Sequence, residues 1–93
     1  MASKRTLKKE INAIASTLVG EYLLTREFIP GVDIASANVV LGKVFDMRKE
    51  FLARVGANGG NDSKQVKAYY RKLRADFDAK VDEIITDFEA LTK

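Results

Sequence analysis

The sequence contains no cysteine and no histidine among its 93 residues. Because it has no cysteine, the chain forms no disulfide and offers no thiolate as a nucleophile or metal ligand. The absence of histidine removes the commonest general base and the commonest ligand of transition metals. We therefore predict no catalytic residue, no metal site and no cofactor, and we expect that the protein is not an enzyme.

Long apolar runs are missing as well. No stretch approaches the roughly 18 consecutive apolar residues that indicate a membrane span. The start, MASKRTLKKEINAIASTLVG, is basic and then amphipathic, so it lacks the apolar segment of a signal peptide. We expect a cytoplasmic protein that makes no contact with membranes, and the length predicts a single helical domain covering residues 1–93.

What the sequence does contain is apolar residues at helical spacing, in three stretches. These stretches predict helices over about 3–26, 34–55 and 63–91. No strand pattern is visible, so we expect an all-α fold, an up-down-up three-helix bundle with a long C-terminal helix. The expected core draws on all three helices: Leu7, Ile11, Ile14, Leu18, Val40, Val44, Met47, Phe51, Tyr70, Leu73, Phe77, Val81 and Ile84.

Turn and capping residues set the expected helix ends. Pro30 and Gly31 end the first helix, because the residue before a proline is pushed out of the helical backbone conformation. Gly56 is expected just beyond the second helix, at the start of the loop GANGGND. The expected N-cap residues are pairs of alternatives, one pair for each helix: Ser3 or Thr6, Asp33 or Ser36, and Asp62 or Ser63.

The third helix is predicted to be about 43 Å long, which exceeds the length of the other two. We expect its C-terminal turns to extend beyond them, with the apolar residues Ile84, Ile85, Phe88 and Leu91. These residues would meet either a partner or an internal cover, and internal cover is slightly favoured. The cover would come from apolar residues in or near the first connection: Phe28, Ile29, Val32 and Ile34.

Five basic residues surround two adjacent tyrosines in the stretch KQVKAYYRKLRADF (64–77). At 100° per residue, Tyr70 lies on the apolar side of the helix, whereas Tyr69 lies at the core margin with its hydroxyl in solvent. The tyrosines therefore form no platform on which bases stack. A basic stripe runs beside the core and turns acidic further along: Lys64, Lys67, Arg71 and Arg74, then Asp78 and Asp82.

The third helix carries its charges in an unfavourable order. Cations near its N-terminus and acids near its C-terminus both oppose the helix dipole, so groups outside the helix should compensate. In the up-down-up topology, residues 1–10 and 47–74 share one end, called here the basic pole, and Lys8 and Lys67 lie at that same end. The basic pole holds twelve basic and three acidic residues, a net charge of +9, and the rest of the chain carries −6.

This polarity favours a non-catalytic helical module that interacts with a protein partner or with itself. An antiparallel homodimer would set each basic pole against the acidic end of the other copy. Candidate contacts with an acidic partner or a polyanion are Lys4, Lys8, Arg54, Lys64, Lys67, Arg71 and Arg74. Candidate apolar interface residues are Ile85, Phe88 and Leu91.

Nucleic-acid binding, through phosphate contacts of the basic pole, is the alternative function. The chain has none of the motif patterns of helix-turn-helix, zinc-finger or RNA-binding domains. Its basic residues are mostly lysines spread over several helix faces, and a run of charges is usually a solvated face. The motifs therefore lend this alternative no support.

Two pairs of carboxylates at helical spacing are the nearest approach to a metal site: Asp78 with Asp82, and Glu83 with Asp87. Di-iron helical bundles need inward-facing glutamates together with a Glu-x-x-His motif, which requires histidine. The Asp78 stripe lies beside the core and not in it. The loop GANGGND also lacks the Gly-Lys-Ser/Thr ending of a phosphate-binding loop. Neither pattern changes the prediction of a non-catalytic protein.

Three segments carry a resemblance to known sequences: KRTLKKEIN, PGVD before the second helix, and AYYRKLRADFDAKVDEII in the third. With them the chain resembles, over most of its length, a family of small helical proteins from Bacteroidetes to which no function is assigned. The resemblance implies an α-helical bundle and carries over no functional residue.

Overall fold

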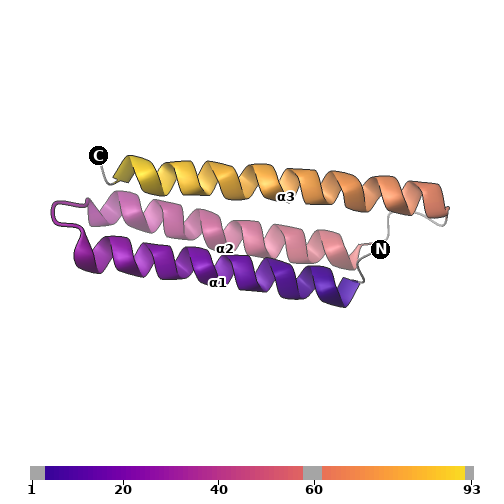
Figure 1. Ribbon diagram of the computed structural model, residues 1–93, viewed down its shortest axis with the longest axis horizontal. Coiled ribbons are helices and arrows are strands. Elements are labelled where there is room, and N and C mark those ends of the chain that lie inside the picture. Colours follow the sequence, from indigo (N-terminus) through magenta and orange to yellow (C-terminus); the bar gives the residue numbers. More distant parts are fainter. Residues whose placement is uncertain (1–3, 58–61, 92–93) are drawn as a thin grey trace.

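The computed structural model describes residues 4–57 and 62–91, which form three helices in an up-down-up bundle (Figure 1). Helix α1 spans Lys4–Phe28, α2 spans Ile34–Gly56, and α3, the longest, spans Ser63–Leu91. The predicted all-α fold is confirmed. Helix α1 ends two residues later than the sequence suggested. The suggested cap Ser3 and loop residues 58–61 lie outside the described residues.

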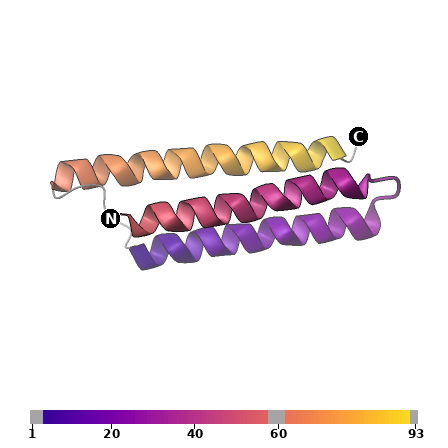
Figure 2. The same cartoon turned by 180° about the vertical axis from the view of Figure 1, so that it is seen from behind.

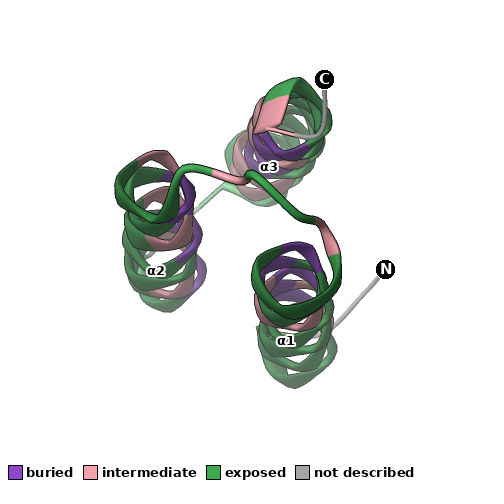
Figure 3. Ribbon diagram, turned by 90° about the vertical axis from the view of Figure 1, so that its left-hand side faces the viewer, coloured by how far each residue is buried: buried purple, intermediate pink, exposed green. Residues whose placement is uncertain are grey.

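One apolar stripe from each helix meets in the core, and the outer faces are exposed (Figure 3). Ten of the thirteen expected core residues are buried. The other three, Ile14, Tyr70 and Val81, are half-buried and pack against the core, because each lies at the edge of its stripe or near the open end of the bundle. The core also contains residues absent from the expected set: Ala15, Tyr22, Ala37, Val55 and Phe88.

The first connection reverses the chain between α1 and α2. The Ile29 amide still donates to the Thr25 carbonyl oxygen at 3.3 Å, and Pro30 then stops the helix. Gly31 has φ of 79°, in the left-handed region that favours glycine. Of the two predicted alternatives, Asp33 caps α2, accepting from the Ala35 amide at 3.1 Å and from the Ser36 hydroxyl at 2.7 Å.

The same glycine-to-alanine change should have opposite effects in the turn and in a helix. Gly31→Ala places a Cβ in the left-handed region and is expected to lower the free energy of unfolding by about 1 to 2 kcal/mol. Gly42→Ala lies in the middle of α2, where an added Cβ meets no atom within 4 Å, and should raise it by about 0.5 to 1 kcal/mol. Urea denaturation measures the free energy of unfolding of both variants. A change of the same sign in both would contradict the left-handed backbone conformation at Gly31.

The end of α2 and the start of α3 correct one detail and confirm another. Gly56 was expected beyond α2, but it is the last helical residue, and Ala57 follows in an extended conformation as the C-cap. The Ala57 amide donates to the Ala53 carbonyl oxygen at 3.0 Å, so the end needs no left-handed residue. Asp62 caps α3, with its carboxylate accepting from the Lys64 amide at 3.0 Å.

The long α3 projects beyond the other helices at the opposite end from the one predicted. Figures 1 and 2 show its N-terminal turns extending past the start of α1 and the end of α2, whereas its C-terminal turns lie beside them. Residues 62–68 are exposed except for half-buried Val66, and Phe88 is buried. This shift makes the bundle 52 Å long and 18 Å across. The projecting turns therefore belong to the basic pole.

Candidate protein-interaction face

Helix α2 supplies the compensation that the charge order of α3 requires. Arg54 of α2 pairs with Asp76 at 3.0 Å, and Lys43 of α2 pairs with Asp87 at 2.7 Å. Because α2 is antiparallel to α3, Lys43 in the first half of α2 lies beside the acidic C-terminal turns of α3, and Arg54 near the end of α2 meets Asp76 at the middle of α3. Lys72 shares Asp76 at 3.3 Å. The seam between α2 and α3 is therefore closed by ion pairs as well as by apolar packing.

These contacts shift the pKa values of two of their members. The hydrogen bond from Arg54 holds the pKa of Asp76 below its ordinary value, with Lys72 adding to the effect. The hydrogen bond to Asp87 raises the pKa of Lys43. At the start of α2, the hydrogen bonds from Ser36 and the Ala35 amide lower the pKa of Asp33. The folded state therefore favours the charged form of each group.

The lowered pKa values predict an acid-sensitive fold. An aspartate whose pKa is lower in the folded state stabilises that state above its unfolded pKa of about 4, and the stabilisation is lost as pH falls through the folded value. The wild-type melting temperature should therefore fall below about pH 4. Asp76→Asn should melt lower than wild type at pH 7 and converge with it in acid, whereas Asp46→Asn, at an exposed position on α2, should change little. Parallel melting curves at all pH values would contradict the role of Asp76.

Two tyrosines fasten the start of α3 to the end of α2. The Tyr69 hydroxyl donates to the Arg54 carbonyl oxygen at 2.7 Å, and the Tyr70 hydroxyl donates to the Val55 carbonyl oxygen at 3.3 Å. Their rings meet edge to face with centroids 5.3 Å apart. The expectation of a solvated Tyr69 hydroxyl was wrong, because the last carbonyl groups of α2 lack helical partners and accept it. Both rings serve packing.

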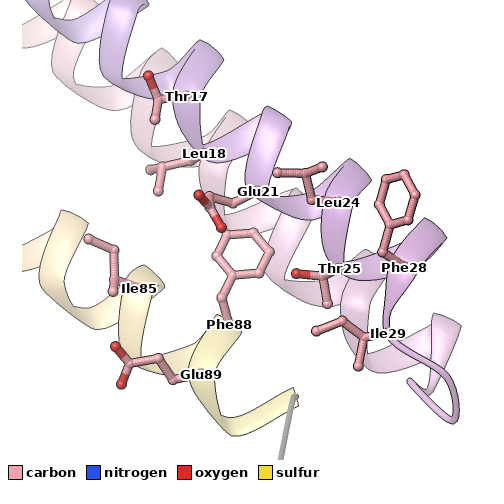
Figure 4. Close-up of a pocket in the computed structure, with 10 residues that line it drawn as sticks. All are labelled: Thr17, Leu18, Glu21, Leu24, Thr25, Phe28, Ile29, Ile85, Phe88 and Glu89. Atoms are coloured by element: carbon pink, nitrogen blue, oxygen red, sulfur yellow. The ribbon is translucent and has the colours of Figure 1, made fainter.

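The seam between α1 and α3 is different, because it is only partly closed. Helix α1 contacts α2 along its length but touches α3 at few places. The Arg74 guanidinium pairs with the Glu10 carboxylate at the basic pole. At the other end the two helices leave a groove of about 530 Å³ (Figure 4). Smaller depressions lie at the α2–α3 and α1–α2 seams, about 310 and 260 Å³ in volume, so the α1–α3 seam offers more room for a further element than either of them.

The groove is apolar with an acidic rim. Phe88 of α3 points toward α1 and forms its floor, and Leu24 and Ile85 lie on opposite sides (Figure 4). Phe28, at the end of α1, is 75% exposed. The charged residues among those that line the groove are both acidic, Glu21 and Glu89. An apolar surface of this kind, rimmed by polar groups, is typical of a site where another chain binds.

The predicted apolar interface residues divide between the core and this groove. Phe88 is only 6% exposed, so it belongs to the core and reaches the groove as its floor. Leu91 is half-buried and packs against the core, whereas Ile85 is exposed. Phe28 does not cover these residues as expected, although Val32 does pack against the core.

Sequence reasoning missed Leu24 and Phe28 as surface residues of the groove. Their spacing offered a signal, because Thr17, Glu21, Leu24 and Phe28 form a second stripe at helical spacing beside the core stripe of α1. Helical spacing places that stripe on one side of the helix but does not say which neighbour it meets. The ion pair between Glu10 and Arg74 shows that this side of α1 faces α3.

The structure also divides the seven candidate basic contacts. Arg54 is engaged internally, since it pairs with Asp76 and lies over the Phe51 ring at 5.0 Å. Arg74 pairs with Glu10. The remaining five are exposed and have no ion pair within the described part of the chain: Lys4, Lys8, Lys64, Lys67 and Arg71. Lys8 is near the start of α1 and Lys67 near the start of α3; the two helices start at the same end of the bundle, as predicted (Figure 1).

One of the two carboxylate pairs, Glu83 with Asp87, contacts lysines. Glu83 accepts from Lys80 at 2.9 Å, and Asp87 accepts from Lys43 at 2.7 Å. Over residues 4–57 and 62–91, no three acidic side chains cluster closely enough to hold a metal ion. In the same ranges, no helix has both the length and the apolar character needed to cross a membrane.

Comparisons with known proteins give no match: no family model, no curated protein and no solved structure is similar to this chain. The resemblance to a family from Bacteroidetes therefore stays a prediction.

Proposed function

We propose that this protein is a small, non-catalytic helical interaction module. It binds a protein through its α1–α3 face, which is the exposed surface along the seam between α1 and α3. The supporting observation is the apolar groove at the opposite end of the α1–α3 seam from the Glu10–Arg74 pair, with Leu24, Phe28 and Ile85 exposed along it. Covering such side chains contributes about 25 cal/mol for each Å² of apolar surface removed from water. The proposal places the protein in the cytoplasm, as the sequence suggested.

The groove fits a helical partner better than a small molecule. It lies between two helices that run in the same direction; the exposed apolar residues on its α1 side, Leu24 and Phe28, are four residues apart, and Ile85 lies on its α3 side. An amphipathic helix laid in such a groove presents anchors at matching spacing. The acidic rim formed by Glu21 and Glu89 adds a preference for basic residues beside those anchors.

Photo-crosslinking in cells of the source organism tests this proposal. A benzophenone amino acid replaces Phe28, and a control chain carries it at Phe45, an aromatic residue that is 52% exposed on the α1–α2 side. We expect protein adducts from position 28 and few from position 45. No adduct from position 28, or equal yields from both positions, would contradict an interaction through the α1–α3 face.

Nucleic-acid binding remains the second candidate, because Lys64, Lys67 and Arg71 are exposed in the first three turns of α3, and the start of α3 projects from the bundle (Figure 1). Titration of labelled mixed-sequence DNA and RNA at low and high salt separates the two functions. Binding with a steep salt dependence, lost in Lys67→Glu/Arg71→Glu/Arg74→Glu, would favour phosphate contacts. Absence of binding at low salt would mean that the basic start of α3 contacts a protein and not nucleic acid.

A further inference from the structure

One face of α3 changes the sign of its charge along its length. Arg74 reaches α1 through Glu10, and Ile85 and Glu89 line the groove with α1, so two well-separated points of this face are fixed toward α1. Residues three and four apart share one side of a helix. The α1-facing stripe therefore comprises, in order, Lys64, Lys67, Arg71, Arg74, Asp78, Asp82, Ile85 and Glu89.

The basic end of this stripe is accessible. Lys67 and Arg71 are exposed and have no ion pair within residues 4–57 and 62–91. They lie in the first three turns of α3, and the start of α3 extends past the start of α1 (Figures 1 and 2). Because α1 starts short of these turns, no part of α1 within the described residues lies beside their α1-facing side. The turns form a basic helical segment that another molecule can contact.

The acidic end of the stripe is complementary to the basic helical segment. It has the apolar groove, with Leu24, Phe28 and Ile85 exposed, and the acidic rim. A two-fold symmetric contact requires a face that is complementary to itself. A stripe with cations at one end and acids with apolar surface at the other meets that requirement when two copies run antiparallel. A parallel arrangement would set cations against cations.

We infer that the α1–α3 face binds a second copy of this chain in antiparallel orientation. The inference rests on the proposed function and names its partner. With the two-fold axis between Arg74 and Asp78, the projecting turns of each copy lie along the groove of the other. The stripe then pairs its charges reciprocally: Lys64 opposite Glu89, Arg71 opposite Asp82, and Arg74 opposite Asp78. Lys67 lies opposite Ile85, where its aliphatic stem covers apolar surface.

Light scattering on the purified full chain gives the first test. We expect twice the 10.3 kDa of one chain at low salt, with a dissociation constant that rises on the order of tenfold at high salt. A mass of one chain at millimolar concentration and low salt would overturn the inference.

Reciprocal charge reversal gives the second and sharper test. Lys64→Glu/Arg71→Glu sets acid against acid at two kinds of contact in a homodimer, 64 with 89 and 71 with 82, and Asp82→Lys/Glu89→Lys sets base against base at the same two. Each variant alone should have the mass of one chain, whereas a 1:1 mixture should regain the mass of two, because every contact in the mixed dimer joins opposite charges. Lys9→Glu/Lys49→Glu reverses two exposed charges of the basic pole and should stay dimeric.

Circular dichroism confirms that each variant keeps its helices before its mass is compared. A dimer that survives both reversals, or a mixture that stays monomeric, would overturn the antiparallel pairing. Failure of the homodimer can be distinguished from failure of the proposed function. A monomeric wild type that still gives photo-adducts with other proteins from position 28 would refute the second copy and retain the interaction face.

Discussion

Replacing Phe77 by alanine is expected to lower the free energy of unfolding by about 3 to 5 kcal/mol. Phe77 is buried near the middle of α3, and its ring meets that of Phe51 edge to face with centroids 5.3 Å apart. Removing it forfeits apolar burial and leaves a cavity between α2 and α3. Small domains are stable by only about 5 to 15 kcal/mol, so the loss is a large share of the total.

Two further variants are compared with Phe77→Ala, one at a buried position and one at an exposed position. Leu73→Ala, at another buried position of α3, should cost about 2 to 5 kcal/mol. Phe45→Ala removes the same ring from an exposed position on α2 and should cost less than about 1 kcal/mol. Urea denaturation followed by circular dichroism measures all three. Similar losses for Phe77→Ala and Phe45→Ala would mean that the packing face of α2 or α3 is assigned wrongly.

Val44→Asp is expected to prevent folding at neutral pH. Val44 is 0% exposed in the middle of α2, where a carboxylate would have no cation or hydrogen-bond donor to receive it. An uncompensated buried charge costs about 3 to 5 kcal/mol or more, and the loss of a buried valine adds to that. The helical signal at pH 7 should be largely lost.

Val39→Asp is the matched control, five residues earlier in the same helix. Val39 is 62% exposed, so the new carboxylate stays in water and the change should cost less than about 1 kcal/mol. Circular dichroism at 25 °C and thermal melting compare the two variants. A folded Val44→Asp variant with a melting temperature close to that of Val39→Asp would contradict the buried face of α2.

Helical spacing predicted the parts of this fold that depend on the angle around a helix. The apolar stripes of all three helices lie where the 3.6-residue period puts them, and Asp33 caps α2 as its position before the apolar run suggested. The compensation for the charge order of α3 also followed from elementary electrostatics, and Arg54 and Lys43 provide it. These features can be predicted because they depend on the local sequence or on the up-down-up order of the helices.

Features that depend on the shift of one helix along another were not predictable from the period. The projecting end of α3 was placed at its C-terminus, because helix lengths give the size of an overhang and not its direction. The core position of Phe88 and the exposure of Phe28 follow from the actual shift, which brings Phe88 beside Leu24 and Thr25. The groove is a consequence of the same register.

Single tryptophan reporters give the most direct test of the claim that the α1–α3 face is where this protein meets its partner copy. The chain contains no tryptophan, so Phe28→Trp and Phe45→Trp each carry one reporter, on the α1–α3 and the α1–α2 side. At low salt and rising concentration, the emission of Phe28→Trp should shift to shorter wavelength as the second copy covers it, and the shift should reverse on dilution or in high salt. The emission of Phe45→Trp should stay unchanged. A Phe28→Trp spectrum typical of a solvated indole at every concentration, or equal shifts at both positions, would contradict the account.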